Sequence, residues 1–263
     1  MPSWPWSRSS STPSCSRPKP GFSAGGTCAL RLEVRSKRYG AAEALRGVRL
    51  EVARDEVVAL VGPSGCGKTT MLNIAAGLDR AFDGEVERVA GTLGYVFQDP
   101  RLLPWRTVRE NVALALPRRE RRSARVEETL AAVEMAGMGD RYPLQLSLGM
   151  ARRVALARAF VVDPDLLLMD EAFVSLDEPT AQRLRALLAA LLEKRPTAVL
   201  FVTHNLREAL GLADRLLVLS PGPGRVVAEV PIRIPRAERG PEVVESLRAD
   251  LLARPEPAFR VLA

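Results

Sequence analysis

The sequence has few of the residues that mark a disulfide-bonded or membrane-spanning protein. It contains three cysteines and one histidine in 263 residues, and 5% of its residues are aromatic. Three cysteines, one of them inside a glycine-rich loop, do not form the framework of a small secreted protein, and they fit a reducing compartment. The apolar run Val161–Met169 is interrupted at 163–165, and no run approaches the roughly 20 residues that cross a bilayer. If the protein works at a membrane, another chain must span it.

Residues 1–28 have the composition of an extension rather than of a folded element. They are rich in Ser, Pro and Arg and contain no acidic residue. They lack the apolar core of a secretory signal peptide, and their prolines interrupt the amphipathic helix of an organelle transit peptide. We therefore expect this segment to be disordered, or to result from a start codon placed too early.

The net charge of +7 raises the question of an anionic partner. One basic cluster, of Arg8, Arg17, Lys19 and Arg31, precedes the first acidic residue of the chain. A second lies at residues 118–125, which hold five arginines and one glutamate. A solvated tail and a solvated helix face are the simpler account of the two clusters. The charge alone does not indicate a partner, and we expect no nucleic-acid partner.

Apolar runs that alternate with helical segments predict an α/β fold built on a parallel sheet. Two segments with alternating apolar and polar residues, 30–34 and 48–52, predict half-exposed antiparallel strands. Continuous apolar runs predict buried parallel strands at 57–61, 93–97, 166–169 and 198–202.

Polar residues follow each predicted buried strand. They are the glycine-rich loop that begins at Gly62, then Gln98, then Asp170 with Glu171, and finally His204. Ligands of an open parallel sheet bind beyond the carboxyl ends of its strands. We therefore expect these groups to converge on one edge of one sheet.

The pattern also divides the chain into parts. Residues 29–222 form the main domain, with a helical subdomain over about residues 100–160, where helical periodicity at 108–116 and 124–135 is punctuated by prolines. Residues 223–263 are rich in proline and hold one short amphipathic stretch. We expect them to be a C-terminal appendage with little chemistry.

The glycine-rich loop has the pattern G-x-x-x-x-G-K-[ST]. It consists of Gly62, Pro63, Ser64, Gly65, Cys66, Gly67, Lys68, Thr69 and Thr70. Its glycines let successive backbone N–H groups turn toward a phosphate, and the N-terminus of the next helix adds its dipole. Lys68 suits the β- and γ-phosphates, and the Thr69 hydroxyl suits Mg²⁺. The alternative is a structural turn, but the place between a buried strand and a helix favours binding of ATP or GTP.

Three polar side chains at the predicted sheet edge complete a hydrolytic site. Asp170 suits an outer hold on Mg²⁺, and Glu171 suits activation of the attacking water. His204, the only histidine, can hydrogen-bond the γ-phosphate and that water. Taken singly, an acidic strand end or a lone histidine is more often structural. Downstream of the phosphate loop, the three residues predict ATP hydrolysis.

Together these motifs resemble the ATP-binding cassette (ABC) ATPases over roughly residues 30–221. The segment Leu146–Met150 is similar to that family's signature, Leu-Ser-Gly-Gly-Gln. In the family the serine and the second glycine contact the γ-phosphate bound to the opposite subunit, which implies this role for Ser147 and Gly149. Leu148 replaces the first glycine. If that position requires a left-handed backbone, the leucine would be strained and these contacts weaker.

The resemblance implies roles for further residues. Tyr39 would stack on adenine, unless it is an ordinary surface tyrosine. Gln98 would be a catalytic residue beside Lys68 and would sense Mg²⁺ and the γ-phosphate. Asp177 would cross the dimer interface and face the partner's site. Ala172 stands where many relatives have proline, a change that we expect to be mild.

Within the family, Phe97–Trp105 resembles the ATPases of importers for nitrate, aliphatic sulfonates and taurine, as do Tyr142–Ser147 and Ala209–Arg215. This resemblance implies the ATP-hydrolysing subunit of a bacterial ABC importer, with ATP and Mg²⁺ as cofactors. Two copies, or one copy and a second cassette, would close around two ATP molecules. The other partners would be an integral-membrane permease and, indirectly, a periplasmic or lipid-anchored solute-binding protein. The chain would be peripheral, on the cytoplasmic face of the inner membrane.

Two other functions fit the same motifs. A non-transport ABC protein acting on DNA or ribosomes would use the basic clusters as its partner surface, but the long coiled-coil insertions or tandem cassettes usual in such proteins are absent from the sequence. A regulatory cassette would bind ATP without hydrolysing it, and Leu148 is the reason to consider it. ATPase activity in the assembled complex separates these functions.

Overall fold

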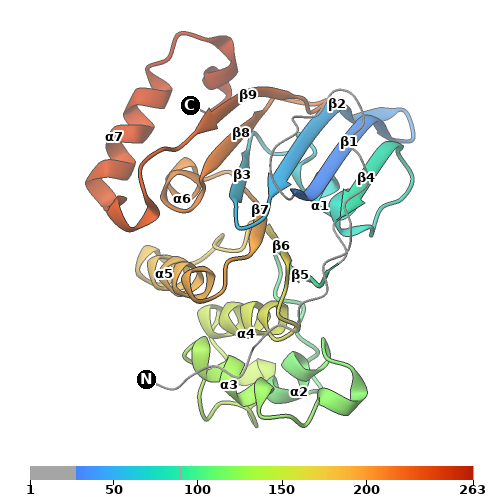
Figure 1. Cartoon of the computed structure of the whole chain (residues 1–263), viewed down its shortest axis with the longest axis vertical. Helices are drawn as coiled ribbons and strands as arrows, with labels where there is room; N and C mark the ends of the chain where they lie inside the picture. Colours follow the sequence, from blue (N-terminus) through green and yellow to red (C-terminus); the bar gives the residue numbers. More distant parts are fainter. Residues whose placement is uncertain (1–27, 89–90, 263) are drawn as a thin grey trace.

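The computed structural model describes residues 28–88 and 91–262, and the strands within them form two sheets (Figure 1). The smaller sheet is antiparallel and has the order β2-β1-β4. Its strands are β1 (Cys28–Tyr39), β2 (Ala42–Ala53) and β4 (Asp83–Arg88). The larger sheet has the order β5-β6-β7-β3-β8-β9. Its strands are β3 (Val57–Val61), β5 (Leu93–Val96), β6 (Leu166–Asp170), β7 (Ala198–Thr203), β8 (Arg215–Leu219) and β9 (Val226–Pro231).

The larger sheet is parallel except at one edge. Strand β3 lies between β7 and β8, and β6 lies between β5 and β7, all in parallel register. Strand β9 pairs with β8 in the antiparallel direction. Strands β3, β6 and β7 are buried along their whole length, which explains their continuous apolar sequences. The parallel direction brings the carboxyl ends of β3, β5, β6, β7 and β8 to the same edge.

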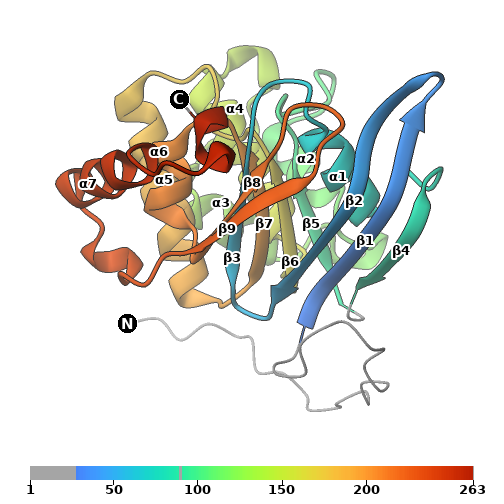
Figure 2. The ribbon, with the colours of Figure 1, turned by 90° about the horizontal axis from the view of Figure 1, so that it is seen from above.

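Helices cover one face of the larger sheet, and the smaller sheet covers the other (Figure 2). The helices on the first face include α5 (Glu178–Lys194), α6 (Leu206–Leu212) and α7 (Pro241–Leu252). Helix α1 (Lys68–Ala76) lies on the other face, where its Met71 joins a buried cluster with Leu60 of β3 and Leu32 of β1. Alternate residues of β3 thus serve two cores, because Val57 and Ala59 pack toward the helices.

A helical subdomain occupies the lower end of the molecule in Figure 1. It contains α2 (Val108–Ala113), α3 (Arg125–Ala132) and α4 (Leu148–Phe160) with the short 3₁₀ helices η1 (Arg118–Glu120) and η2 (Pro143–Gln145). Helix α2 begins at a capping box in which Thr107 and Glu110 satisfy each other's backbone N–H groups. Both α2 and α3 are shorter than predicted. Helix α2 ends ahead of Pro117, and α3 ends ahead of Glu134, whose φ of 56° lies outside the helical region.

The predicted parallel sheet with an antiparallel sheet and a helical subdomain is confirmed, but the chain's ends differ from expectation. Cys28, placed in the tail, is the first residue of β1, and the predicted disorder of residues 1–27 lies outside the described residues. Strands β8 and β9 were not predicted. The expected boundary at residue 222 therefore falls within the larger sheet, and we propose that the main domain runs through Pro231.

Beyond β9 the chain forms the 3₁₀ helix η3 (Arg236–Glu238), helix α7 and the 3₁₀ helix η4 (Pro257–Leu262). Helix α7 packs against α6, where Glu245 pairs with Arg207 at 2.8 Å. No helix within 28–88 and 91–262 is both long and apolar enough to span a membrane.

Candidate active site

The glycine-rich loop leaves β3 and leads directly into α1. Gly67 closes the loop with φ of 96°, a left-handed conformation that favours glycine, and Lys68 is the first residue of the helix. The Lys68 side chain is buried, and its Nζ donates to the carbonyl oxygens of Gly62 at 2.9 Å and Pro63 at 3.0 Å. The ammonium group thus lies inside the loop, where phosphate oxygens can replace the two carbonyls as acceptors.

Asp170 ends β6 with its carboxylate against this loop. It is 4% exposed, and its Oδ1 accepts a hydrogen bond from the Thr69 hydroxyl at 3.1 Å. Burial raises the pKa of the Asp170 carboxyl, while the Thr69 hydrogen bond and the charge of Lys68 oppose the rise. Hydroxyl, amide and carboxylate oxygens are the donors that Mg²⁺ prefers. The pair Thr69 and Asp170, with Gln98 lining the same cavity, therefore fits a Mg²⁺ ion.

Glu171 and His204 meet at the ends of β6 and β7. His204 Nδ1 lies 3.3 Å from Glu171 Oε2, and the glutamate side chain is 17% exposed. The backbone of Glu171 has φ of 42°, unusual for a residue other than glycine, and its N–H donates to the Val202 carbonyl at 3.0 Å. Strained backbone of this kind gathers at functional sites. The contact with His204 is the interaction described for this carboxylate at the sheet edge.

A network behind His204 fixes the start of α6. The Thr203 hydroxyl donates to Glu208 Oε2 at 2.6 Å and accepts from the Asn205 N–H at 3.0 Å. Glu208 is buried, and burial raises the pKa of its carboxyl, which the hydrogen bond from Thr203 opposes. These contacts fix the residues on both sides of His204, Thr203 and Asn205, and so fix the backbone position of the histidine.

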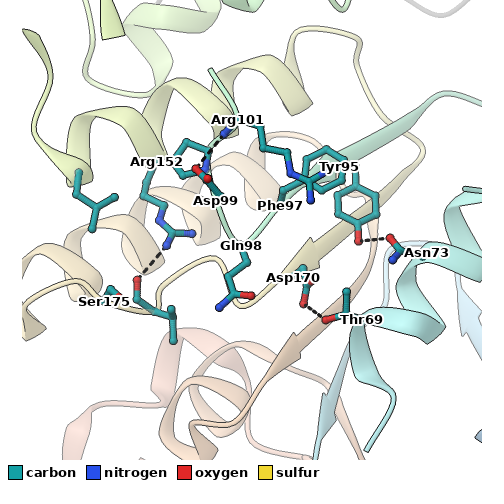
Figure 3. Close-up of a pocket in the computed structure, with 13 residues that line it drawn as sticks. Thr69, Asn73, Tyr95, Phe97, Gln98, Asp99, Arg101, Arg152, Asp170 and Ser175 are labelled. Atoms are coloured by element: carbon teal, nitrogen blue, oxygen red, sulfur yellow. Dashed lines mark hydrogen bonds between the residues drawn. The ribbon is translucent and has the colours of Figure 1, made fainter. Parts of the chain in front are cut away.

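A cavity of about 470 Å³ opens beside these groups (Figure 3). Gln98 lies at its centre, with Ser175 on one side and Asp170 on the other. Arg152 of α4 points toward the Ser175 segment and donates to the Val174 carbonyl at 3.1 Å. Its Nε and Nη1 have no hydrogen-bond partner among the described residues, and burial lowers the pKa of the guanidinium. Sequence reasoning missed Arg152, since two consecutive arginines do not reveal which one faces inward.

The signature segment begins α4. Ser147 is the N-cap, with its Oγ accepting from the Met150 N–H at 3.3 Å. Leu148 follows as the first helical residue, outside the left-handed region, and is 44% exposed. The strain considered for leucine at this position is therefore absent. Gly149 packs closely against α5, because a Cβ added there would be 2.7 Å from Thr180 Cγ2.

Asp177 is the N-cap of α5, and its carboxylate accepts from the Thr180 N–H at 3.1 Å. The hydrogen bonds from Thr180 lower the pKa of this carboxyl. Asp177 and Ser147 are exposed, and the hydrogen bonds described for their side chains run to their own helices. Among the described residues, neither side chain hydrogen-bonds to the glycine-rich loop of its own chain.

Tyr39 lies at the end of β1 and is 53% exposed. Its hydroxyl donates to Asp79 Oδ2 at 2.9 Å, and Lys37 Nζ lies 4.4 Å from the ring centroid. Lys37 is itself buried and bonded to Asp79 at 2.7 Å. The ring is thus anchored at its hydroxyl and covered by a cation on one face.

The fold is an α/β fold whose phosphate loop joins β3 to α1, and together with this site it defines a P-loop ATPase. Residues 45–174 match the family model described as ABC transporter. The chain is 45% identical over 232 residues to the aliphatic sulfonates import ATP-binding protein SsuB 2 of Burkholderia lata, covering 85% of each chain. It is 48% identical over 217 residues to the aliphatic sulfonates import ATP-binding protein SsuB of Granulibacter bethesdensis, covering 82% of this chain and 90% of that one.

Solved structures agree with these relatives. The fold is similar to a dimeric ATP-binding cassette in a post-hydrolysis state bound to ADP and Pi, with a TM-score of 0.68 and 32% identity. That comparison covers 78% of this chain and 99% of the cassette. The chain belongs to the ABC transporter family, and within it to the ATP-hydrolysing cassettes. The resemblance predicted from the sequence motifs is confirmed.

Proposed function

We propose that this chain hydrolyses ATP to power the import of a small anion of the sulfonate, taurine or nitrate type through a separate permease. The observation that carries the proposal is the pairing of Glu171 with His204 at the sheet edge from which the Lys68 loop also leaves, in a chain similar to proteins named for aliphatic sulfonate import. The chain would work as a peripheral subunit on the cytoplasmic face of a bacterial inner membrane. A solute-binding protein would deliver the anion to the permease from the other side.

The test is transport in proteoliposomes that hold this chain with its permease and a solute-binding protein. We expect ATP-dependent uptake of labelled taurine, an alkanesulfonate or nitrate, and we expect Lys68→Ala to abolish it. ATP hydrolysis without uptake of any of the three would refute the solute class. A complex that binds ATP without hydrolysing it would favour the regulatory cassette instead.

The residues at the sheet edge support a hydrolytic mechanism. Lys68 and the backbone N–H groups of the loop would bind the β- and γ-phosphates. Glu171 would accept a proton from the attacking water, and His204 would orient that water and donate to a phosphate oxygen. Thr69 and Asp170, with Gln98, would hold Mg²⁺, which when bound supplies positive charge to the phosphates.

Each site needs a second subunit to be complete. Ser147 is exposed at the start of α4 and Gly149 is half-buried two residues on, and there the signature would meet the γ-phosphate bound by a partner copy. Asp177 lies at a comparable exposed helix start and would face the partner's site. The dimeric state of the similar cassette supports two copies closing around two ATP molecules. The permease would contact the segment 98–105, where Trp105 is 70% exposed.

A base-stacking role for Tyr39 predicts the result of its removal. Base–aromatic stacking is worth about 1–3 kcal/mol, so Tyr39→Ala should raise the Kd for ATP about 5- to 150-fold. Tyr39→Phe should bind like the wild type, since it keeps the ring and loses only the hydrogen bond to Asp79. Titration of ATP against each variant measures both, with Tyr142→Ala, another half-exposed tyrosine, as the control. Unchanged binding by Tyr39→Ala would make this an ordinary surface residue.

The raised pKa of Asp170 predicts opposite effects of Asp170→Asn on stability and on metal dependence. A carboxyl whose pKa is raised by folding destabilises the native state while ionised, and this cost disappears as pH falls through its pKa. Asp170→Asn should therefore increase the free energy of unfolding of the nucleotide-free protein at pH 7, with little change in acid. Its Mg²⁺-dependent gain in ATP affinity should fall about 10- to 100-fold. Asp140→Asn, at a 91% exposed aspartate, is the control.

A further inference from the structure

The loop that joins β8 to β9, residues 220–225, lies next to the phosphate loop. Strand β8 runs parallel to β3 with Val61 opposite Val218, so both strands end at the same edge of the larger sheet. The chain then turns, with Gly224 bridging to Leu45 of β2, and comes back as β9 beside β8 (Figure 1). From the sequence, this Ser-Pro-Gly-Pro-Gly-Arg segment is predicted to lie at the start of a C-terminal appendage and to hold no site residue.

Gly224 is the point of closest approach. Its N–H donates to the Ala44 carbonyl at 2.9 Å, and its carbonyl accepts from the Arg46 N–H at 3.1 Å, so that it bridges to Leu45 of β2. A Cβ added to Gly224 would lie 2.0 Å from the carbonyl oxygen of Cys66. The backbone of Gly224 is not left-handed, so glycine is needed there for space and not for conformation.

Two buried leucines make similar approaches to the phosphate loop. A Cβ on Gly67 would lie 2.5 Å from Leu45 Cδ2, and one on Gly62 would lie 3.0 Å from both Cβ and the carbonyl oxygen of Leu219. Leu45 and Leu219 are both 0% exposed. We call Leu45, Leu219 and Gly224 the loop floor. At each of these three contacts with the phosphate loop, an added Cβ would lie 3.0 Å or less from the facing atom.

We propose that the loop floor sets the position of the phosphate loop, with Gly224 as a positioning residue for ATP binding. The proposal rests on the phosphate-binding role of Gly62–Thr70. Backbone N–H groups bind a phosphate only when they point at one centre. A displacement of the Cys66 peptide turns its neighbours' N–H groups away from that centre. The tight contacts of the loop floor therefore give the phosphate loop its shape before ATP arrives.

The test compares alanine at two glycines of the same loop. Gly224→Ala must displace the Cys66 peptide, and misplacement by about 1 Å costs up to about a hundredfold in binding or rate. We expect its Kd for ATP to rise about 10- to 100-fold. Gly222→Ala should change the Kd less than about twofold, because the nearest atom to its added Cβ is 3.8 Å away and its backbone is not left-handed. Isothermal titration with ATP gives the Kd, and thermal melting without nucleotide reports the fold.

Ser220→Ala tests the same proposal without adding an atom. The Ser220 hydroxyl lies within hydrogen-bonding distance of the Pro221 and Pro223 carbonyls and accepts from the Arg225 N–H. Its loss should loosen Gly224 and raise the Kd for ATP a few fold, with the melting temperature of the nucleotide-free protein nearly unchanged. If Gly224→Ala does not fold, the Kd of Ser220→Ala tests the proposal: a raised Kd supports the loop floor, and an unchanged Kd overturns it.

Lys68→Ala separates this proposal from the one on which it rests. Strong ATP binding by Lys68→Ala would mean that Gly62–Thr70 is not the phosphate site. Weak binding by Lys68→Ala together with wild-type binding by folded Gly224→Ala and Ser220→Ala would overturn the loop floor alone. A raised Kd in both loop variants, with Gly222→Ala unchanged, supports it.

Discussion

Glu171→Gln is expected to slow ATP turnover at least about a hundredfold while leaving ATP binding intact. The amide keeps the size of the carboxylate and can still hydrogen-bond His204, but it cannot accept a proton from the attacking water. General base catalysis contributes about 10²- to 10⁴-fold, so kcat should fall within that range. Because the bound ATP is not cleaved, two subunits should stay closed around it and elute as a dimer in gel filtration.

The measurements are steady-state ATPase activity, an ATP titration and the elution volume with ATP and Mg²⁺. Glu193→Gln, at an exposed position on α5, controls for the loss of one negative charge. The positive φ of Glu171 makes a second control useful, since Glu171→Ala keeps the strained backbone and removes the whole side chain. A Glu171→Gln enzyme that hydrolyses ATP near the wild-type rate would refute the general-base role.

The core strands could be predicted because each is buried on both faces. In β3, β6 and β7 the apolar run is continuous, and it ends at the active edge in the glycine-rich loop for β3 and in a polar residue for β6 and β7. Strand β8 has a similar signal in Leu216–Leu219, followed by a serine and two Pro-Gly pairs. Its recognition as a fifth parallel strand would have placed residues 220–225 beside the phosphate loop. Strand β8 could therefore have been predicted from the sequence.

Other features of the site could not be read from the sequence. The 3.3 Å approach of His204 to Glu171 depends on the order of β6 and β7 in the sheet, which no local pattern contains. The inward orientation of Arg152 depends on how α4 packs against the Val174 segment. The absence of backbone strain at Leu148 depends on where α4 begins, because an N-cap at Ser147 puts the leucine in ordinary helical backbone. Helix starts are the least certain part of any sequence-based prediction.

A second large effect is expected at Ser147, and it needs a design that separates two roles of one side chain. Ser147 caps α4, so Ser147→Ala should cost about 1 kcal/mol of stability in addition to any lost contact with phosphate. Ser147→Asp keeps a good cap but sets a negative charge where the partner's γ-phosphate would lie. It should melt like the wild type and still lose about 10²- to 10³-fold in kcat, as when a phosphate-facing donor is removed. Wild-type turnover by Ser147→Asp would contradict a contact with phosphate.

Mixing two inactive variants then tests whether the site is shared between subunits. If Ser147 completes the partner's site, a dimer of one Lys68→Ala chain and one Ser147→Asp chain carries both defects in one site and none in the other. Random exchange makes half of the dimers mixed, so about a quarter of wild-type activity should return, provided that each site works independently. If Ser147 acted on the nucleotide of its own chain, every site would carry one defect and mixing would restore nothing. Chains mixed before refolding or co-expressed with two tags give this measurement, and Ser147→Asp mixed with itself gives the background.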